Sequence, residues 1–174
     1  MRLFIGIALD GALRAQLKRE SDALRAHMRG NFSPPYNYHV TLAFLGQHEA
    51  DEIPAISAAM DAAAACGRFD FGVGGLGSFK KGSRQIVWVG VERAGALCTL
   101  QKKLCAELRA RGVAFNDEGA YRPHITLARQ CELAPLPAGS VNYRQRAYAI
   151  TLFESARVDG ELRYTPIENA YFGA

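Results

Sequence analysis

Apolar and polar residues follow one another along the chain with two different periods. Short runs that are apolar throughout, or apolar at every second position, predict β-strands; these runs span residues 2–9, 38–45, 69–76, 85–92, 122–129, 143–157 and 161–167. Apolar residues spaced three or four apart predict amphipathic helices; these segments span residues 11–28, 50–65 and 95–111. The polar stretch GSFKKGSR and the proline-rich stretch ELAPLPAGS are expected to be surface loops.

The predicted strands and helices do not alternate regularly, and the last two strands are expected to form a hairpin that turns at Asp159–Gly160. This order favours the α+β class. No linker and no low-complexity segment interrupts the chain. We therefore expect residues 1–174 to form a single domain.

The composition is typical of a folded domain. The chain has 174 residues, of which 49% are hydrophobic and 22% charged, and this length suffices for a sizeable core. No apolar run approaches the roughly 20 residues that cross a bilayer, and the apolar N-terminus lacks the cleavage site of a signal peptide. The cysteines form no Cys-x-x-Cys pair and are expected to be buried, reduced thiols; they are Cys66, Cys98, Cys105 and Cys131. These features predict a cytoplasmic protein without a membrane partner.

A five-residue pattern, His-x-Thr-Leu-Ala, occurs twice, first in HVTLAFLG and again in RPHITLAR. Alternate side chains of a strand share a face, so His39 and Thr41 are expected to point one way, as are His124 and Thr126. The apolar residues between them anchor each strand in a core. The repetition favours two similar lobes, and if these face each other, two imidazoles and two hydroxyls converge on one cleft. His27 and His48 have no such context and are expected to lie on the surface.

Acidic residues are missing around both copies of the pattern. No Asp or Glu occurs between Asp22 and Glu49, or between Glu118 and Glu132, and the net charge is +4. A site built from the two copies would therefore lie in a neutral to positive field, which suits an anionic ligand. Strands are poor in acidic residues in general, which accounts for part of this pattern.

Two histidines and two hydroxyls are compatible with several kinds of chemistry. A metal site is possible, but hydrolytic metal sites commonly use three or more ligands, and no carboxylate lies near either copy in the sequence. A threonine nucleophile would have its base two residues away on the same face, a poor position for attack. Acid–base catalysis fits better, because one imidazole can take a proton from water while the other gives one to a leaving oxygen. Displacement at phosphorus needs these two groups on opposite walls.

The sequence resembles the 2H phosphoesterases, in particular their RNA 2′,3′-cyclic phosphodiesterase branch, also called 2′-5′ RNA ligases. HVTLAFLG and RPHITLAR match the paired His-x-Thr motifs of that family, and RLFIGIALD, GSFKKGSRQIVWVGV and LFESARVDGELRYTPI support the match. The resemblance implies two pseudo-symmetric lobes of antiparallel sheet with helices packed outside, around a central cleft. It also implies hydrolysis of a terminal 2′,3′-cyclic phosphate to a 2′-phosphate, without a metal or other cofactor.

The resemblance further implies roles for individual residues. It assigns protonation of the departing 3′ oxygen to His39, activation of water to His124, and contacts to the phosphate to Thr41, Thr126 and Arg129. The two motif copies are nearly interchangeable, so the residues alone would not distinguish acid from base. Strict alternation places Arg129 on the face opposite His124, so it reaches the cleft only if the strand ends or twists there.

Basic and aromatic residues outside the two motifs do not decide which substrate is bound. The basic loop residues could follow an RNA backbone or form a polar turn; they are Lys80, Lys81 and Arg84. Phe44 and Trp88 could stack a base, but both are expected to be buried and are left out of the site. The expected partners are RNA 3′ ends or small nucleotides with a 2′,3′-cyclic phosphate, bound by a monomer. Three alternatives remain: a phosphodiesterase that acts on small cyclic-phosphate nucleotides, 2′-5′ ligation by the reverse reaction, and a non-catalytic module that binds nucleotides or RNA ends.

Overall fold

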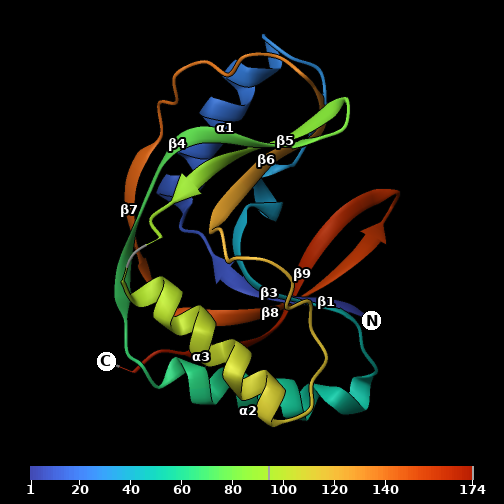
Figure 1. The fold of residues 1–174 in the computed structure, drawn as a ribbon, viewed down its shortest axis with the longest axis vertical. Helices are drawn as coiled ribbons and strands as arrows, with labels where there is room; N and C mark the ends of the chain where they lie inside the picture. The colour runs from blue at the N-terminus through green and yellow to red at the C-terminus, as the bar shows by residue number, and fades with distance from the viewer. Residues whose placement is uncertain (94, 174) are drawn as a thin grey trace.

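The computed structural model describes residues 1–93 and 95–173, which form two antiparallel sheets (Figure 1). The first sheet has four strands in the order β3-β1-β8-β9; these are β1 (Arg2–Ala8), β3 (His39–Gln47), β8 (Ala149–Val158) and β9 (Glu161–Tyr171). The second sheet has five strands in the order β2-β6-β5-β4-β7; these are β2 (Asn31–Phe32), β4 (Phe69–Lys81), β5 (Arg84–Val91), β6 (His124–Glu132) and β7 (Asn142–Ala147). The chain passes repeatedly from one sheet to the other.

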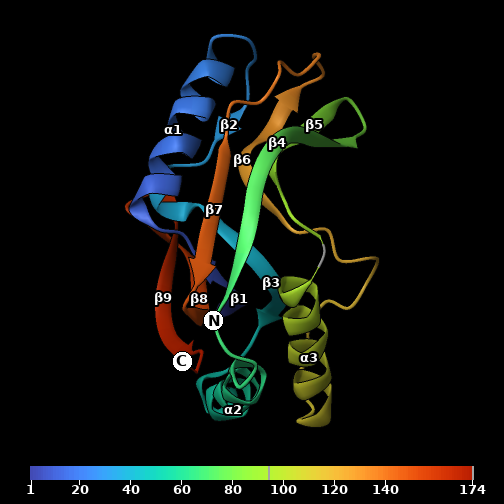
Figure 2. The ribbon, with the colours of Figure 1, turned by 90° about the vertical axis from the view of Figure 1, so that its left-hand side faces the viewer.

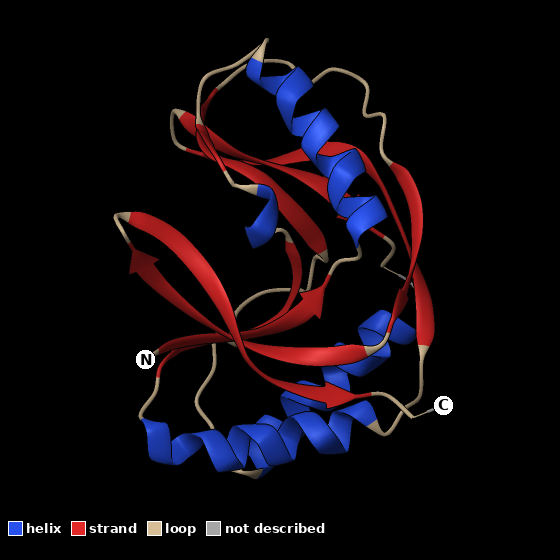
Figure 3. Cartoon of the chain, turned by 180° about the vertical axis from the view of Figure 1, so that it is seen from behind, coloured by secondary structure: helices blue, strands red, loops and turns tan. Residues whose placement is uncertain are grey.

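Three α-helices cover the outer faces of the sheets: α1 (Gly11–Arg25), α2 (Ile53–Ala64) and α3 (Ala96–Ala110). Figure 2 shows α1 along the second sheet, and α2 and α3 side by side at the first sheet. Seen from behind, the β8–β9 hairpin extends as a curved arm beyond the rest of its sheet (Figure 3). The α+β class with two antiparallel sheets and outer helices is thus confirmed. No described helix is long and apolar enough to cross a membrane.

The sequence pattern explains why the helices lie where they do. In α1 the apolar stripe of Leu13, Leu17 and Leu24 is buried, and the Asp10 carboxylate accepts a hydrogen bond of 2.8 Å from the Leu13 backbone N–H at the start of the helix. The helix ends at Arg25, before the predicted position 28. Buried residues of both sheets belong to one hydrophobic cluster. The two sheets are therefore joined by a common core.

Two segments differ from the sequence-based predictions. The stretch GSFKKGSR is mostly strand: β4 continues to Lys81, and the chain turns at Gly82, whose φ is +61°. The predicted strand 143–157 is two strands, because the chain leaves the second sheet at the end of β7 and enters the first sheet at Ala149. A β-rich run shows no signal for this change of sheet, since both strands present the same kind of alternation.

Two predictions of exposure were also wrong: His48 was expected on the surface and Cys66 in the core. His48 is only 3% exposed, and its Nε2 atom lies 3.0 Å from both the Leu45 and Ala114 carbonyl oxygens, so it is part of the fold. His27 is exposed, as predicted. Among the cysteines, Cys66 is exposed and not buried, whereas Cys105 and Cys131 are buried; all four thiols are free.

Candidate active site

The two His-x-Thr copies occupy equivalent positions on facing strands. His39 is the first residue of β3 and His124 the first residue of β6, one in each sheet. The rings of both are partly buried. Tyr121, three residues before β6, donates a hydrogen bond of 2.7 Å from its hydroxyl to the Thr41 carbonyl oxygen and so links the segment that leads into β6 to β3. The repeated sequence therefore forms a repeated structure.

A β-bulge interrupts the alternation in each copy at the same place. In β3, Thr41 is paired with Gly6 and Ala43 with Ile5, so Leu42 is an extra residue. In β6, Thr126 is paired with Trp88 and Ala128 with Val87, so Leu127 is an extra residue. The Leu-Ala pair of each motif is consequently buried as a whole, and the following residue returns to the face of the histidine.

The bulges decide where Phe44 and Arg129 point. Phe44 is 51% exposed instead of buried, which corrects the prediction that it faces the core. Arg129, at the equivalent position of the second copy, lies on the face of His124 and lines the same cavity as His39. Strict alternation would have placed both side chains on the wrong face.

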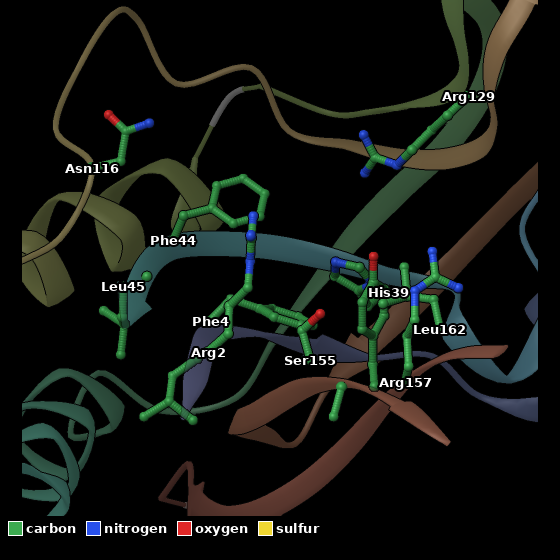
Figure 4. Close-up of a pocket in the computed structure, with 14 residues that line it drawn as sticks. Arg2, Phe4, His39, Phe44, Leu45, Asn116, Arg129, Ser155, Arg157 and Leu162 are labelled. Carbon is green, nitrogen blue, oxygen red and sulfur yellow. The ribbon is translucent and has the colours of Figure 1, made fainter. Parts of the chain in front are cut away.

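A cavity of about 760 Å³ lies beside His39 (Figure 4). It is lined by Phe4, Phe44, Arg129 and Tyr164, together with Arg2 and Arg157 at its edges. A second cavity of about 300 Å³ is lined by Thr41 and His124 and shares Phe44 and Asn116 with the first. Because they share these two lining residues, the two cavities adjoin, and together they are called the cleft. Of the predicted site residues, only Thr126 lines neither cavity; it is half-buried on β6.

Both imidazoles are oriented by the backbone in the same way. The Nδ1 atom of His39 lies 2.7 Å from the Asn37 carbonyl oxygen, and that of His124 lies 2.6 Å from the Arg122 carbonyl oxygen. Only an N–H can donate to a carbonyl, so the proton of each neutral ring is on Nδ1 and the lone pair is on Nε2. In both copies the acceptor is two residues before the histidine. Each Nε2 atom is thereby left for proton transfer.

The two copies differ in what Nε2 contacts. His39 Nε2 lies 2.8 Å from the Thr41 hydroxyl oxygen, which donates to the neutral ring. Within residues 1–93 and 95–173, His124 Nε2 has no such hydrogen bond. The lone pair of His124 is therefore the more accessible of the two.

Aromatic rings pack against both histidines, and the sequence patterns did not reveal this. The His39 ring is 4.7 Å from the Phe4 ring and 5.2 Å from the Tyr164 ring, between centroids. The His124 ring is 5.0 Å from the Phe79 ring and 6.1 Å from the Trp88 ring. Trp88 is only partly buried and borders the site, which corrects its assignment to the core. Its indole lies over Gly77 of β4, where a larger residue would not fit, because an added Cβ would come within 2.2 Å of the ring.

The environment lowers the pKa of both imidazoles. Burial is the main cause for His39 and lowers its pKa to about 4, assisted by the positive charges of Arg129 and of His124 when protonated. Burial is also the main cause for His124, whose pKa is lowered with a further contribution from Arg129. The hydrogen bonds from Nδ1 to backbone carbonyls oppose these shifts. Both rings are therefore neutral at pH 7 before an anion binds.

The low pKa of His39 predicts a specific pH dependence of stability. The folded protein binds the His39 proton only near pH 4, whereas the unfolded chain binds it near pH 6.5, so stability is full above pH 6.5 and is lost as the pH falls. We expect about 3 kcal/mol of the unfolding free energy to be lost over this window, at about 1.4 kcal/mol per unit of pKa difference. Denaturant unfolding of the wild type and of His39→Gln across this pH range measures it.

The variant should show a shallower loss of stability than the wild type between pH 6.5 and 4. His27→Gln is the matched control, because that histidine is exposed, and it should follow the wild-type curve. Parallel curves for the wild type and His39→Gln would contradict the prediction.

Potential metal ligands do not cluster in the described part of the chain: no group of three or more His, Cys, Asp or Glu side chains is placed to bind one ion. The acidic residues of the smaller cavity are Asp117 and Glu118. The Asp117 carboxylate pairs with Arg109. The larger cavity is lined by no carboxylate among the described residues and by three arginines, so its field is positive.

The paired motifs, the two sheets and the cleft define a class, and the chain belongs to the 2′-5′ RNA ligase superfamily, whose family pattern matches residues 10–156. The resemblance inferred from the motifs is thus confirmed. The RNA 2′,3′-cyclic phosphodiesterase of Escherichia coli (strain K12) is 27% identical over 176 residues, which cover 96% of this chain and 94% of the relative. The RNA 2′,3′-cyclic phosphodiesterase of Thermotoga maritima is 32% identical over 140 residues, which cover 74% of this chain and 70% of the relative.

Solved structures share the fold over nearly the whole length. The crystal structure of Escherichia coli LigT complexed with 3′-AMP superimposes with a TM-score of 0.83 at 27% identity, and it covers 99% of this chain and 98% of LigT. Other crystal structures of LigT are complexes with NADP+ or ATP. LigT, which has the same architecture, thus binds nucleotides in several of its crystal structures.

Proposed function

We propose that this protein hydrolyses the 2′,3′-cyclic phosphate at an RNA 3′ end to a 2′-phosphate by acid–base catalysis with two histidines. The observation on which this depends is the matched pair of imidazoles on facing strands. Each ring lines one of the two adjoining cavities, and a backbone carbonyl 2.6–2.7 Å away fixes its Nδ1 atom, so that Nε2 carries the lone pair. The curated relatives that are RNA 2′,3′-cyclic phosphodiesterases support this activity.

The proposed reaction is a single displacement at phosphorus. His124 Nε2 takes a proton from a water molecule, and the water oxygen forms a bond to phosphorus on one side. The bond between phosphorus and the 3′ oxygen breaks on the other side, and protonated His39 gives its Nε2 proton to that oxygen. The products are a 2′-phosphate and a free 3′-hydroxyl. Proton exchange with solvent returns both rings to their starting states.

The difference between the two copies supports this division of roles. The base must start with a free lone pair, and His124 Nε2 is the one without a hydrogen bond to a threonine in the described structure. The acid must start protonated, whereas burial, with a contribution from Arg129, lowers the pKa of His39 to about 4 in the free protein. An anionic phosphate bound beside the ring raises this pKa, because it stabilises the imidazolium. A protonated His39 also releases the Thr41 hydroxyl, which can then donate to a phosphoryl oxygen.

Three further residues are proposed to hold the phosphate. The Thr41 hydroxyl lies beside His39 Nε2, and the Arg129 guanidinium faces the same cavity. Both can donate hydrogen bonds to oxygens on which negative charge increases in the transition state. Thr126 is the counterpart of Thr41 in the second copy, and we propose that it reaches a phosphoryl oxygen once substrate occupies the cleft.

The test uses an oligoribonucleotide that ends in a 2′,3′-cyclic phosphate, incubated with and without excess chelator. We expect formation of a 2′-phosphate end at the same rate in both samples. A 3′-phosphate product would mean that the 2′ oxygen, and not the 3′ oxygen, is the leaving group. Loss of activity with chelator would contradict metal-independent catalysis. Binding without turnover would favour the module that only binds nucleotides or RNA ends.

The same acid and base could join a 2′,3′-cyclic phosphate end to a 5′-hydroxyl end, as the superfamily name suggests. Attack by a 5′ oxygen in place of water leaves the same 3′ oxygen as leaving group and forms a 2′-5′ linkage. Adding a second oligonucleotide with a 5′-hydroxyl to the hydrolysis assay tests this activity. A product of the summed length indicates ligation.

A further inference from the structure

The larger cavity extends well beyond the two histidines and is bordered by guanidinium groups from three strands. Arg2 is at the start of β1, Arg157 near the end of β8, and Arg129 on β6 of the other sheet. Figure 4 shows Arg2 and Arg157 on two sides of the cavity, with Arg129 reaching in from the facing strand. Arg129 is already assigned to the cyclic phosphate. Arg2 and Arg157 have no part in the proposed reaction.

These two arginines have donors that the protein does not use. Across residues 1–93 and 95–173, Arg2 makes no side-chain hydrogen bond or ion pair, and Arg157 donates only one hydrogen bond, from Nη1 to the Gly160 carbonyl oxygen at 3.0 Å. Both side chains are exposed. A guanidinium group has five N–H donors in a planar fork that fits two phosphate oxygens. The rim therefore offers cationic donors without anionic partners.

The walls of the cavity match the remainder of a nucleotide. Two packed aromatic rings line the cavity: Tyr164 lies edge-on against Phe4 at 4.9 Å between centroids, and Phe4 is supported by stacking on the buried Phe153 at 5.0 Å. The ribose that bears the cyclic phosphate is bonded, through its 5′ carbon, to the next phosphate of an RNA chain. His39 lines this cavity together with Arg2 and Arg157, so the cavity is adjacent space for that next phosphate when the cyclic phosphate lies beside His39.

We infer that Arg2 and Arg157 form a second phosphate subsite, which binds the phosphate on the 5′ side of the terminal ribose. This inference rests on the proposed function and specifies its substrate class. The enzyme should prefer an RNA end, or a nucleotide with a 5′-phosphate, over a nucleoside 2′,3′-cyclic phosphate that lacks one. Binding in this subsite is remote from the reacting atoms and acts mainly on KM.

The experiment compares three substrates that share the reacting group: adenosine 2′,3′-cyclic phosphate, the same compound with a 5′-phosphate, and the dinucleotide ApA with a 2′,3′-cyclic phosphate end. We expect kcat/KM to be roughly tenfold higher for each of the two substrates with an additional phosphate, as for a charge-assisted hydrogen bond. Arg2→Gln and Arg157→Gln should each reduce this preference and leave the reaction of adenosine 2′,3′-cyclic phosphate nearly unchanged.

Arg19→Gln is the matched control, because it removes the same charge from the exposed surface of α1, away from the cavity. It should preserve the preference. Equal kcat/KM for all three substrates, or a preference that survives both cavity variants, would overturn the subsite while leaving the proposed function intact. If none of the substrates is hydrolysed, the proposed function itself fails. A higher kcat/KM for the dinucleotide, without a higher kcat/KM for the nucleotide with a 5′-phosphate, would mean that the cavity binds the additional nucleoside. This result too would overturn the subsite.

Discussion

Replacing His39 or His124 by alanine will lower kcat/KM for a 2′,3′-cyclic phosphate end by ~10²–10⁴-fold each, the usual contribution of a general acid or base. Each ring lines the cleft and has its Nε2 atom set by a hydrogen bond from Nδ1 to the backbone. The two losses should not multiply in the double variant, because residues that act in one step as a unit are not additive. Steady-state kinetics on the oligonucleotide substrate measures all three variants.

The loss must be separated from a loss of folding. Removing the His39 ring leaves the Asn37 carbonyl oxygen without its donor, at a cost of about 1–3 kcal/mol if water does not replace it. Thermal unfolding of each variant is therefore measured beside its kinetics. His27→Ala removes an exposed imidazole and should retain full activity. A folded His39→Ala or His124→Ala variant with wild-type kcat/KM would remove that ring from the proposed mechanism.

Arg129→Gln will lower kcat/KM by roughly 10- to 100-fold, because a hydrogen bond to a charged phosphoryl oxygen contributes about 1.5–3 kcal/mol. It will also shift the pH profile. Arg129 lowers the pKa of both imidazoles in the free protein, so its removal raises them. The alkaline side of the kcat/KM profile, where the acid loses its proton, should therefore move to higher pH. Profiles of wild type and variant, measured with subsaturating substrate, test the direction.

Arg129→Lys distinguishes charge from geometry. Lysine keeps the positive charge but lacks the planar fork of donors, so the pH profile should stay close to wild type while kcat/KM falls. If neither variant changes the profile, Arg129 does not act on the imidazoles. If neither changes kcat/KM, it does not contact the phosphate.

Much of the architecture could be predicted from the order of apolar and polar residues. The buried stripe of α1 and the two strands that begin at His39 and His124 are where periodicity placed them. Periodicity failed where one local pattern fits two environments. The run 143–157 looks like a single strand, yet Tyr148 separates a strand of one sheet from a strand of the other. His48 resembles a loop histidine, but contacts from distant backbone atoms bury it.

The sequence by itself determined which groups are available for chemistry. Two pentapeptides of one pattern, HVTLA and HITLA, place a histidine and a threonine at alternate positions, which any strand would present on one face. The acid-poor surroundings are equally visible in the sequence. These features suffice to predict a paired site for an anion and the family to which the chain belongs.

Only the tertiary structure decided what surrounds that site. Whether Phe44 and Arg129 face the cleft depends on a bulge in each strand, and a bulge arises from pairing with a neighbouring strand that is distant in sequence. The pKa of His39 depends on burial by rings of other strands, such as Phe4 and Tyr164. Register, burial and the arginines at the rim are properties of contacts between segments, and no local pattern contains them.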